Sequence, residues 1–319
     1  MTVLEAIQKS ADFLAGRGVE SPRLQAELLL AHRLGLPRLK LYLNFERALT
    51  VAETDAFREW VRRRSRREPL QHILGSTSFC GFDIAVSRRA LVPRPETELL
   101  AELGWKWLAR RASANAPDVT ALDLGTGSGC IAIALAAKCP SAKIAATDVS
   151  PGALALARDN AAKNKVAGRI AFLQGDGFAA FRPAGQVAQA PNQKPENGDG
   201  DSEDPLLQEF DLIISNPPYI PSAEIETLQP EVRDYDPREA LDGGADGLDF
   251  YRRFAAQAKP FLKPDGKLML EFGDGQAEAV RRIFENEKWI VEAVKEDYSQ
   301  RARILIATAA SRSRGNTGG

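Results

Sequence analysis

The chain has 319 residues, 44% of them hydrophobic and 27% charged, with a formal net charge of −1 at pH 7, and its length favours two domains. The near-neutral charge excludes a general attraction to phosphate backbones, and no apolar run approaches the roughly 18–20 residues of a membrane span, so we expect a cytoplasmic protein with neither a membrane nor a direct nucleic-acid partner. Three scattered cysteines and two histidines form neither a disulfide framework nor a metal-ligand pattern, and no bound metal is expected.

Helical patterns run through residues 3–72 and predict a small helical bundle. In "SPRLQAELLLAHRLGL", Ser21 suits a helix N-cap and Pro22 suits the first helical position. Leucines recur there near helical spacing: Leu24, Leu28 and Leu34. In "ETDAFREWVRRRSRRE", apolar side chains fall on one side of a second helix: Phe57, Trp60 and Val61. The basic run at residues 62–67 favours a solvated helix face, with contact to an anionic partner as the alternative.

An extended segment follows at residues 76–92, "STSFCGFDIAVSRRALV", whose alternation predicts a short β hairpin or an extended linker. Next, "PRPETELLAELGWKWLARR" opens with Pro95 and two acids, which suits a first helical turn. We therefore expect a helical domain at 1–74, a hairpin linker at 75–92 and a larger domain at 93–310, followed by a disordered tail at 311–319.

From about Val119, apolar strands alternate with amphipathic helices as far as the strand-like segments "WIVEAVKE" and "RARILIAT". Continuous apolar strands between helices predict an α/β fold with an open, doubly wound and mostly parallel sheet that is covered on both faces. One segment interrupts this pattern. Residues 183–205 are rich in Pro, Gly, Asn, Gln and acids with almost no large apolar side chain, and they predict a mobile surface insertion.

The first strand of this pattern ends in a glycine-rich loop, "LDLGTGSGC". Glycine at every second position allows tight turns and a close approach of the backbone to a ligand at the carboxyl edge of the sheet. The spacing G-x-G-x-G differs from the G-x-G-x-x-G of dinucleotide sites, which disfavours a nicotinamide-dependent dehydrogenase. We expect a cofactor-binding loop formed by Gly125, Thr126, Gly127, Ser128 and Gly129.

Acids follow the next two strands. Asp148 closes "AATDVS", where a carboxylate would hold the two hydroxyl groups of a ribose. A cap on the helix that starts at Pro151 is the alternative interpretation of this residue. Asp176, with Gly177 after it in "QGDGF", is placed to meet an adenine amino group. Together with the glycine loop, these acids predict a cofactor that carries a nucleoside.

The fourth strand, "FDLIIS", leads into Asn216-Pro217-Pro218-Tyr219. This tetrapeptide and the glycine loop resemble those of the class I S-adenosylmethionine-dependent methyltransferases that modify a planar amide or amino nitrogen. Other stretches resemble one family among them, the protein-(glutamine) methyltransferases of peptide chain release factors, or HemK/PrmC family: "REPLQHILG", "LVPRPETE", "DPREALDGGADGLDFYRR" and "LMLEFG". The resemblance extends from about Val3 to Thr308.

The resemblance implies a class I methyltransferase (Rossmann-like) fold and transfer of a methyl group from S-adenosylmethionine, leaving S-adenosylhomocysteine. The implied acceptor is the glutamine side-chain amide in the Gly-Gly-Gln motif of class I release factors, with the helical domain docking this partner. We expect a monomer. Two departures from the family pattern are present: the insertion at 183–205 is longer than the usual connection, and Gly177 rather than an aromatic residue directly follows Asp176.

A carboxamide nitrogen is a poor nucleophile because its lone pair is delocalised into the carbonyl group. If the Asn216 side-chain oxygen and the Pro217 carbonyl oxygen accept its two N–H groups, the lone pair is directed at the methyl group. Two prolines stiffen this loop, and Tyr219 would pack against the flat amide. We therefore expect Asn216, Pro217 and Tyr219 to be catalytic, Asn216 also to contact the cofactor, and these three with Pro218 to bind the substrate.

Phe79 and residues 94–98 resemble the substrate-side wall of the family, although a core phenylalanine and a helix start explain them equally well. Glu271 and Cys130 receive structural interpretations only. Two other functions stay open. A methyltransferase for the exocyclic amino groups of nucleic-acid bases shares the planar geometry, but it would need a basic groove and a target-recognition domain. A non-catalytic adaptor would keep the fold and would be expected to lose Asn216 or the glycines.

Overall fold

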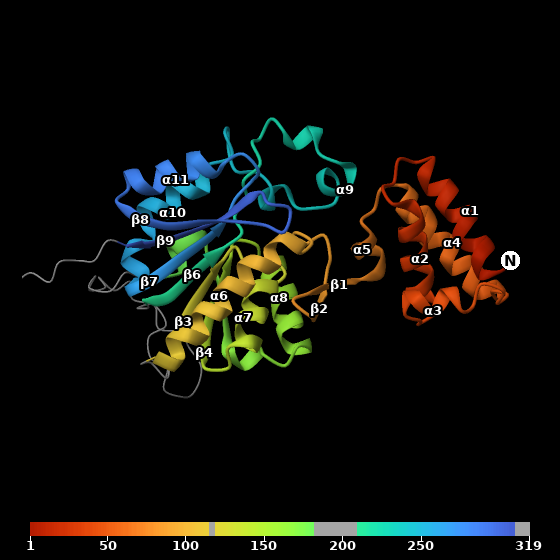
Figure 1. Cartoon of the computed structure of the whole chain (residues 1–319), viewed down its shortest axis with the longest axis horizontal. Coiled ribbons are helices and arrows are strands. Elements are labelled where there is room, and N and C mark those ends of the chain that lie inside the picture. Colours follow the sequence, from red (N-terminus) through yellow and green to blue (C-terminus); the bar gives the residue numbers. More distant parts are fainter. Residues whose placement is uncertain (115–118, 182–208, 310–319) are drawn as a thin grey trace, which may run out of the picture.

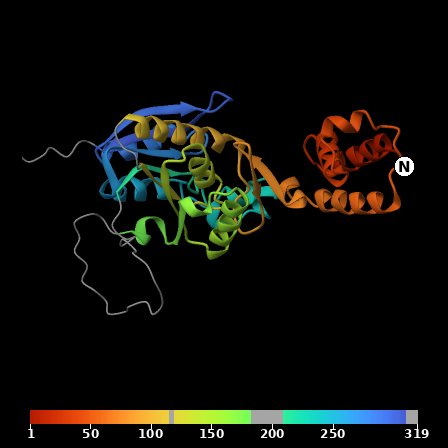
Figure 2. The same ribbon diagram turned by 90° about the horizontal axis from the view of Figure 1, so that it is seen from below.

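The computed structural model describes residues 1–114, 119–181 and 209–309 (Figure 1). The predicted insertion at 183–205 and the predicted tail at 311–319 lie outside these residues. In the described chain, helices come first, a short hairpin follows, and a seven-stranded sheet with helices on both faces makes up the rest. Figure 2 shows the helical bundle set apart from the sheet, with the hairpin segment between them.

The N-terminal bundle comprises α1 (Val3–Ala15), α2 (Pro22–Arg33), α3 (Arg38–Tyr42), α4 (Val51–Ser65) and α5 (Leu70–Leu74), which confirms the helices predicted over residues 3–72. Capping boxes start α1 and α4, where Thr2 and Thr50 exchange hydrogen bonds with the glutamates three residues on. The helices surround a core of their own, with large side chains almost fully buried: Ile7, Leu29, Leu30, Leu41 and Phe57. Each such burial stabilises the bundle by roughly 1.5–3 kcal/mol.

The buried face of α2 differs from the one that the predicted leucine spacing would favour. Ala26 and Leu29 are buried, whereas Leu24 is 42% exposed and Leu28 is half-buried. Leucines occupy both sides of this helix, so their spacing alone does not select the side against which α1 and α4 pack. Ser21 occupies the predicted N-cap position of α2, but it has a left-handed φ of 46° and its side chain makes no capping bond.

The predicted hairpin is present as β1 (Ser76–Phe79) and β2 (Phe82–Ala85), which pair antiparallel. Its turn, Cys80-Gly81, has φ angles of 51° and 84°, and positive φ at both central residues is typical of a type I′ turn. The Cys80 amide donates to the Glu98 carboxylate at 2.9 Å. This bond fixes the hairpin against the first turn of α6 (Pro95–Ala114).

A second contact attaches the hairpin to the sheet and its helices. The side chain of Asn160 is completely buried, and it accepts from the Ala85 amide at 2.8 Å and donates to the Ala85 carbonyl at 3.0 Å. The same side chain donates to the carbonyl of Ser128, in the glycine loop, at 2.9 Å. The linker and the glycine loop are therefore held by one asparagine.

The seven strands of the sheet follow the order β5-β4-β3-β6-β7-β9-β8. Their bounds are β3 (Val119–Leu124), β4 (Ala142–Asp148), β5 (Ile170–Gln174), β6 (Phe210–Ser215), β7 (Leu262–Glu271), β8 (Trp289–Glu296) and β9 (Ala302–Ala309). The strands from β5 to β7 pair in parallel, while β9 pairs antiparallel with both β7 and β8. This arrangement confirms the predicted mostly parallel sheet.

Helices cover both faces of the sheet (Figure 1). On one face, α6, α7 (Cys130–Lys138) and α8 (Pro151–Lys163) enclose a core that includes Leu100, Leu135 and Ile214. On the other face, α10 (Asp249–Gln257) and α11 (Ala277–Asn286) enclose a core that includes Tyr251, Phe272 and Phe284. Because the central strands are covered on both faces, every residue of β6 is buried. Parallel strands end at one edge, so the loops after β3, β4, β5 and β6 meet there.

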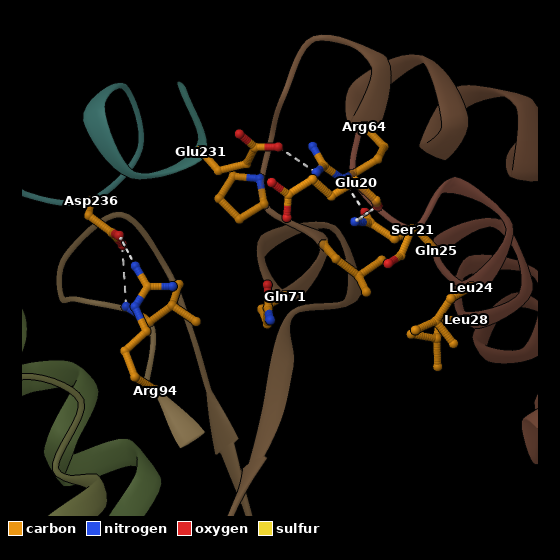
Figure 3. Close-up of a pocket in the computed structure, with 13 residues that line it drawn as sticks. Glu20, Ser21, Leu24, Gln25, Leu28, Arg64, Gln71, Arg94, Glu231 and Asp236 are labelled. Atoms are coloured by element: carbon orange, nitrogen blue, oxygen red, sulfur yellow. Dashed lines mark hydrogen bonds and ion pairs between the residues drawn. The ribbon is translucent and has the colours of Figure 1, made fainter. Parts of the chain in front are cut away.

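The bundle contacts the segment that follows β6, which carries α9 (Pro230–Arg233) (Figure 3). Glu231 accepts from Arg64 at 2.5 Å and from Arg67 at 2.7 Å, beside a cavity of about 310 Å³. The Arg64 side chain is only 4% exposed. The prediction of a solvated face for the basic run at 62–67 is therefore wrong at this position, because the guanidinium group joins two parts of the same chain.

Candidate active site

A cavity of about 450 Å³ opens at the carboxyl edge of the sheet, where the loops after β3, β4, β5 and β6 meet. Cavities of roughly 300–1,000 Å³ are typical of small-molecule sites. Ten of the predicted site residues line it: Gly125, Thr126, Gly127, Ser128, Asp148, Asp176, Gly177, Asn216, Pro217 and Pro218. Three others do not: Gly129, Tyr219 and Phe79.

The glycine loop turns from β3 into α7 through three left-handed residues, Gly125 (φ 68°), Gly127 (φ 55°) and Gly129 (φ 81°). A residue with a Cβ atom would have a strained backbone at these φ values. Space is a second constraint at Gly129, because an added Cβ would lie 3.0 Å from the Cβ of Ala157 in α8. Gly129 therefore allows the loop to pack closely on α8, while the other two glycines present bare backbone to the cavity.

Asp123, the last acid of β3, holds this loop from below. It is completely buried, and it accepts from the Thr126 hydroxyl at 2.7 Å and from the Ala132 amide at 3.2 Å. Burial raises the pKa of the Asp123 carboxyl to about 7. Because Asp123 does not line the cavity, its contribution is to the shape of the loop.

Asp148 connects the end of β4 to the same loop. Its two oxygens accept from the Gly127 amide and the Ser150 amide, each at 2.9 Å, and burial raises its pKa. A carboxylate has about four acceptor positions, so both oxygens keep capacity for a ligand in the cavity. The cap of α8 is Ser150, whose hydroxyl accepts from the Ala153 amide, so the capping interpretation of Asp148 is not needed.

Asp176 lies at the rim of the cavity after β5. Its carboxylate accepts from Arg253 at 2.7 Å, and its side chain is 63% exposed. Phe178, two residues on, does not line the cavity and packs in the core beneath α10. The aromatic lining comes instead from Phe250 and Phe254 of α10, which the sequence pattern alone presented only as part of an amphipathic helix.

Residues 216–218 leave β6 and line the cavity, whereas the ring of Tyr219 packs against the core on the α10 side. Burial raises the pKa of the Tyr219 hydroxyl to about 12. Its backbone carbonyl accepts from the Gln276 side chain at 2.9 Å. Gly247 packs so closely against this carbonyl that an added Cβ would lie 2.3 Å from the oxygen. These contacts fix the loop that carries Asn216 on the side that faces away from the cavity.

The side chain of Asn216 is oriented by Thr97, which the sequence marked only as part of the segment 94–98. Its Nδ2 donates to the hydroxyl of Thr97 at 3.0 Å, so Oδ1 is the amide atom that Thr97 does not engage, and the residue lines the cavity. Thr97 lies in the first turn of α6 and is only 3% exposed. Behind it lies Glu271 at the end of β7, whose pKa burial raises to about 7 although a hydrogen bond from Thr97 opposes the rise.

The two predicted elements of the substrate-side wall have different positions. Phe79 is 1% exposed and belongs to the core beneath α6 and α7, so the structure replaces its predicted substrate contact with the core interpretation. Arg94 does line the cavity, and it pairs with the buried Asp236 at 2.6 Å. Within residues 1–114, 119–181 and 209–309, no three His, Cys, Asp or Glu side chains are grouped as a metal site requires. No helix in these ranges has the length and apolarity of a membrane span.

Two family models match the chain: a PrmC N-terminal domain over residues 5–75 and a methyltransferase domain over residues 115–309. A release factor glutamine methyltransferase of Geobacter sulfurreducens is 44% identical, over 89% of this chain and 88% of that protein. Another of Chlorobaculum tepidum is 41% identical over 97% of both chains. Among solved structures, the hMettl16 catalytic domain in complex with a 3′UTR hairpin has a TM-score of 0.50 and 14% identity, covering 83% of this chain and 84% of that one. This last likeness is one of fold.

Proposed function

The chain belongs to the release factor glutamine methyltransferase family, and from this premise we propose that it methylates the glutamine side-chain amide in the Gly-Gly-Gln motif of class I peptide chain release factors. The proposed methyl donor is S-adenosylmethionine, which leaves as S-adenosylhomocysteine. One observation carries the proposal: the Asn216 side chain, with its nitrogen bound to Thr97, lines a cavity together with the glycine loop and Asp148. That combination suits transfer of a methyl group to a planar nitrogen beside a nucleoside.

The lining of the cavity supports this choice of cofactor. Gly125 and Gly127 allow the backbone to approach a ligand, and the free acceptor positions of Asp148 suit the hydroxyl groups of a ribose. The aromatic side chains of α10 offer apolar faces to an adenine ring. Asp176 keeps one oxygen that is not paired with Arg253, and we assign it to the adenine amino group. When bound, the cofactor supplies an electrophilic methyl group attached to a sulfonium.

The residues after β6 provide what an unreactive amide needs. The Asn216 Oδ1 and the Pro217 carbonyl are proposed to accept the two N–H groups of the glutamine, which holds the nitrogen with its lone pair toward the methyl group. Neither proline of the pair has an N–H that would compete for these acceptors. Preplaced acceptors stabilise the positive charge that builds on the nitrogen, so they favour the transition state over the substrate. We assign Tyr219 the support of this loop.

We further propose that residues 1–74 form a docking domain for the body of the release factor, with 75–92 as linker and 93–310 as catalytic domain. A three-residue target is much smaller than the roughly 800 Å² per partner of a specific interface. The bundle exposes large apolar side chains, among them Leu39 at 72% and Leu43 at 77%, and we assign these to contact with the release factor. A release factor as partner implies a cytoplasmic location, and we propose a monomeric enzyme.

The proposal is tested with labelled S-adenosylmethionine and two purified release factors, one with Gly-Gly-Gln and one with Gly-Gly-Ala. We expect label only on the first, at the glutamine, as located by mass spectrometry of the peptide. Equal labelling of both would exclude glutamine as the acceptor. A parallel reaction with DNA and RNA tests base methylation, and label there without label on the release factor would favour that alternative.

A further inference from the structure

Thr97 is placed beside Asn216 by the packing of α6 on β6. On the same helix, Gly104 approaches β6 so closely that an added Cβ would lie 3.0 Å from the Cδ1 of Ile214. This contact sets the separation between the helix and the strand that carries Asn216. In the first turn of α6, the Thr97 hydroxyl lies 3.0 Å from Asn216 Nδ2, and Thr97 lines the same cavity as Asn216.

Glu271 fixes which atom of Asn216 faces Thr97. A hydroxyl has one hydrogen to donate, whereas a carboxylate only accepts. The Glu271 side chain, which is 2% exposed and whose Oε2 finds no partner among the described residues, lies beside the Thr97 hydroxyl, which lowers its pKa. Above about pH 7, where Glu271 is ionised, its carboxylate only accepts, so Thr97 donates its hydrogen to Glu271 and accepts from Asn216. The Asn216 amide must present its NH2 group to Thr97, which turns its oxygen the other way.

We propose that Thr97 is a positioning residue for methyl transfer: its hydroxyl, held by Glu271, selects the orientation of Asn216 in which the side-chain oxygen faces the substrate nitrogen. The two orientations of an asparagine amide have nearly the same shape, so packing alone does not distinguish them. In the opposite orientation, the Asn216 NH2 group would face the N–H groups of the substrate and could not accept from them. The inference rests on the proposed function, because that function gives Asn216 its acceptor role.

The size of the effect follows from the strength of one orienting hydrogen bond. Its loss leaves both amide orientations accessible and removes an interaction that matters in the transition state, so we expect a reduction of roughly 10- to 100-fold in kcat. The contacts proposed above for the cofactor, through the glycine loop, Asp148 and Asp176, and the docking of the release factor on the bundle do not depend on the orientation of the Asn216 amide. The KM for the release factor and the Kd for S-adenosylmethionine should therefore stay within about threefold of wild type.

The test compares two variants of matched shape. Thr97→Val removes the hydroxyl and keeps the branched side chain, and Thr97→Ser keeps the hydroxyl. The control is Thr147→Val in β4, which removes another buried hydroxyl, 1% exposed as a residue and without a partner among the described residues. Each protein is assayed for kcat and KM with release factor and for cofactor affinity by calorimetry. Thr97→Ala replaces Thr97→Val if calorimetry shows that the valine variant does not fold.

A second measurement does not depend on activity. In protein labelled with ¹⁵N at asparagine, the side-chain NH2 signals of Asn216 are identified by their loss in Asn216→Ala. We expect Thr97→Val to shift these signals and to speed their exchange with water, while Thr97→Ser and Thr147→Val leave them close to wild type.

The inference would be overturned if Thr97→Val had the kcat of wild type and unchanged Asn216 signals. It would also be overturned if Thr97→Ser lowered kcat as much as Thr97→Val. Failure of the proposed function looks different: the wild-type protein would leave the release factor unlabelled, while the Asn216 signals would still respond to Thr97→Val. That outcome supports the orienting contact and rejects the substrate.

Discussion

Arg64 and Glu231 lie 167 residues apart in the sequence and form an ion pair with an N–O distance of 2.5 Å, in which the arginine side chain is only 4% exposed. The same carboxylate oxygen also accepts from Arg67. A buried pair is costly to break from one side, because the remaining charge is left without a counter-charge. This pair joins the helical bundle to the segment that continues from Asn216.

The first prediction concerns this pair. Glu231→Ala is expected to lower the free energy of unfolding by about 2 kcal/mol, because Arg64 keeps its bonds to Gln25 and to the Glu68 carbonyl but loses its counter-charge. Urea denaturation measures the change. The matched control is Glu226→Ala, whose partner Arg238 and own side chain are both exposed, so its effect should be small. Equal losses in the two variants would contradict a special role for the buried pair.

The second prediction concerns cofactor affinity. Asp148→Ala removes the proposed acceptors of the ribose and also the acceptor of the Gly127 amide, so the glycine loop loses part of its support. We expect the Kd for S-adenosylmethionine to rise roughly 10- to 100-fold, as a loss of one or two charge-assisted hydrogen bonds implies. Isothermal titration calorimetry gives this value directly. Asp55→Ala, at an exposed site in α4, serves as control, and an unchanged Kd for Asp148→Ala would remove Asp148 from the cofactor site.

The third prediction uses two glycines with the same backbone conformation. Gly247 has φ 76° and Gly275 has φ 80°, but only Gly247 lacks space, since its added Cβ would lie 2.3 Å from the Tyr219 carbonyl oxygen. Gly275→Ala should cost about 1 kcal/mol of stability from backbone strain alone. Gly247→Ala should cost more and should also reduce kcat, because it displaces the loop that carries Asn216. Stability by urea denaturation and kcat are measured together, and identical behaviour of the two variants would show that the loop tolerates displacement.

The fourth prediction concerns pH. Burial raises the pKa of Glu271 from 4.5 to about 7. Thr97 and the positive charges of Arg303 and Arg94 oppose this rise. The negative charge of Glu96 adds to it. Between these values the folded protein holds a proton that the unfolded chain has released, so the free energy of unfolding falls as pH rises from about 4.5 to about 7 and is level above. The fall amounts to about 3 kcal/mol.

Glu271→Gln does not titrate and isolates this contribution, because Asp123, whose pKa is raised in the same direction, is present in both proteins. The difference in unfolding free energy between wild type and variant should change by about 3 kcal/mol across this range when measured in urea at several pH values. If the unfolding free energies of the two proteins changed with pH in parallel, Glu271 would not titrate between pH 4.5 and 7.

The sequence predicts best what depends on neighbours along the chain. The strands of the sheet are continuous apolar runs, the hairpin segment is marked by its alternation, and the glycine loop is marked by its spacing. Parallel strands must end at one edge, so placing Asp148 and Asn216 near one another required no coordinates. These inferences rest on two kinds of rule: those that relate residues a few positions apart in the sequence, and those that apply to every parallel sheet.

Contacts across the fold were not predictable in the same way. The bond from Asn216 to Thr97 depends on how closely α6 approaches β6, and that separation is set by Gly104 against Ile214 rather than by any pattern near either partner. The side of α2 that is buried depends on the helices around it, because leucines occupy both sides. Phe79 fits a core and a substrate wall equally well until the hairpin is placed beneath α6.

The hydrogen bonds of Asn160 define where the chain can be divided. Its completely buried side chain reaches both the hairpin, at Ala85, and the glycine loop, at Ser128. A fragment that began at residue 93 would leave one donor and one acceptor of this amide buried without partners, next to the loop proposed to hold the cofactor. The smallest catalytic fragment that folds by itself should therefore retain residues 75–92. To move the catalytic domain into another protein, the chain should be cut before the hairpin rather than after it.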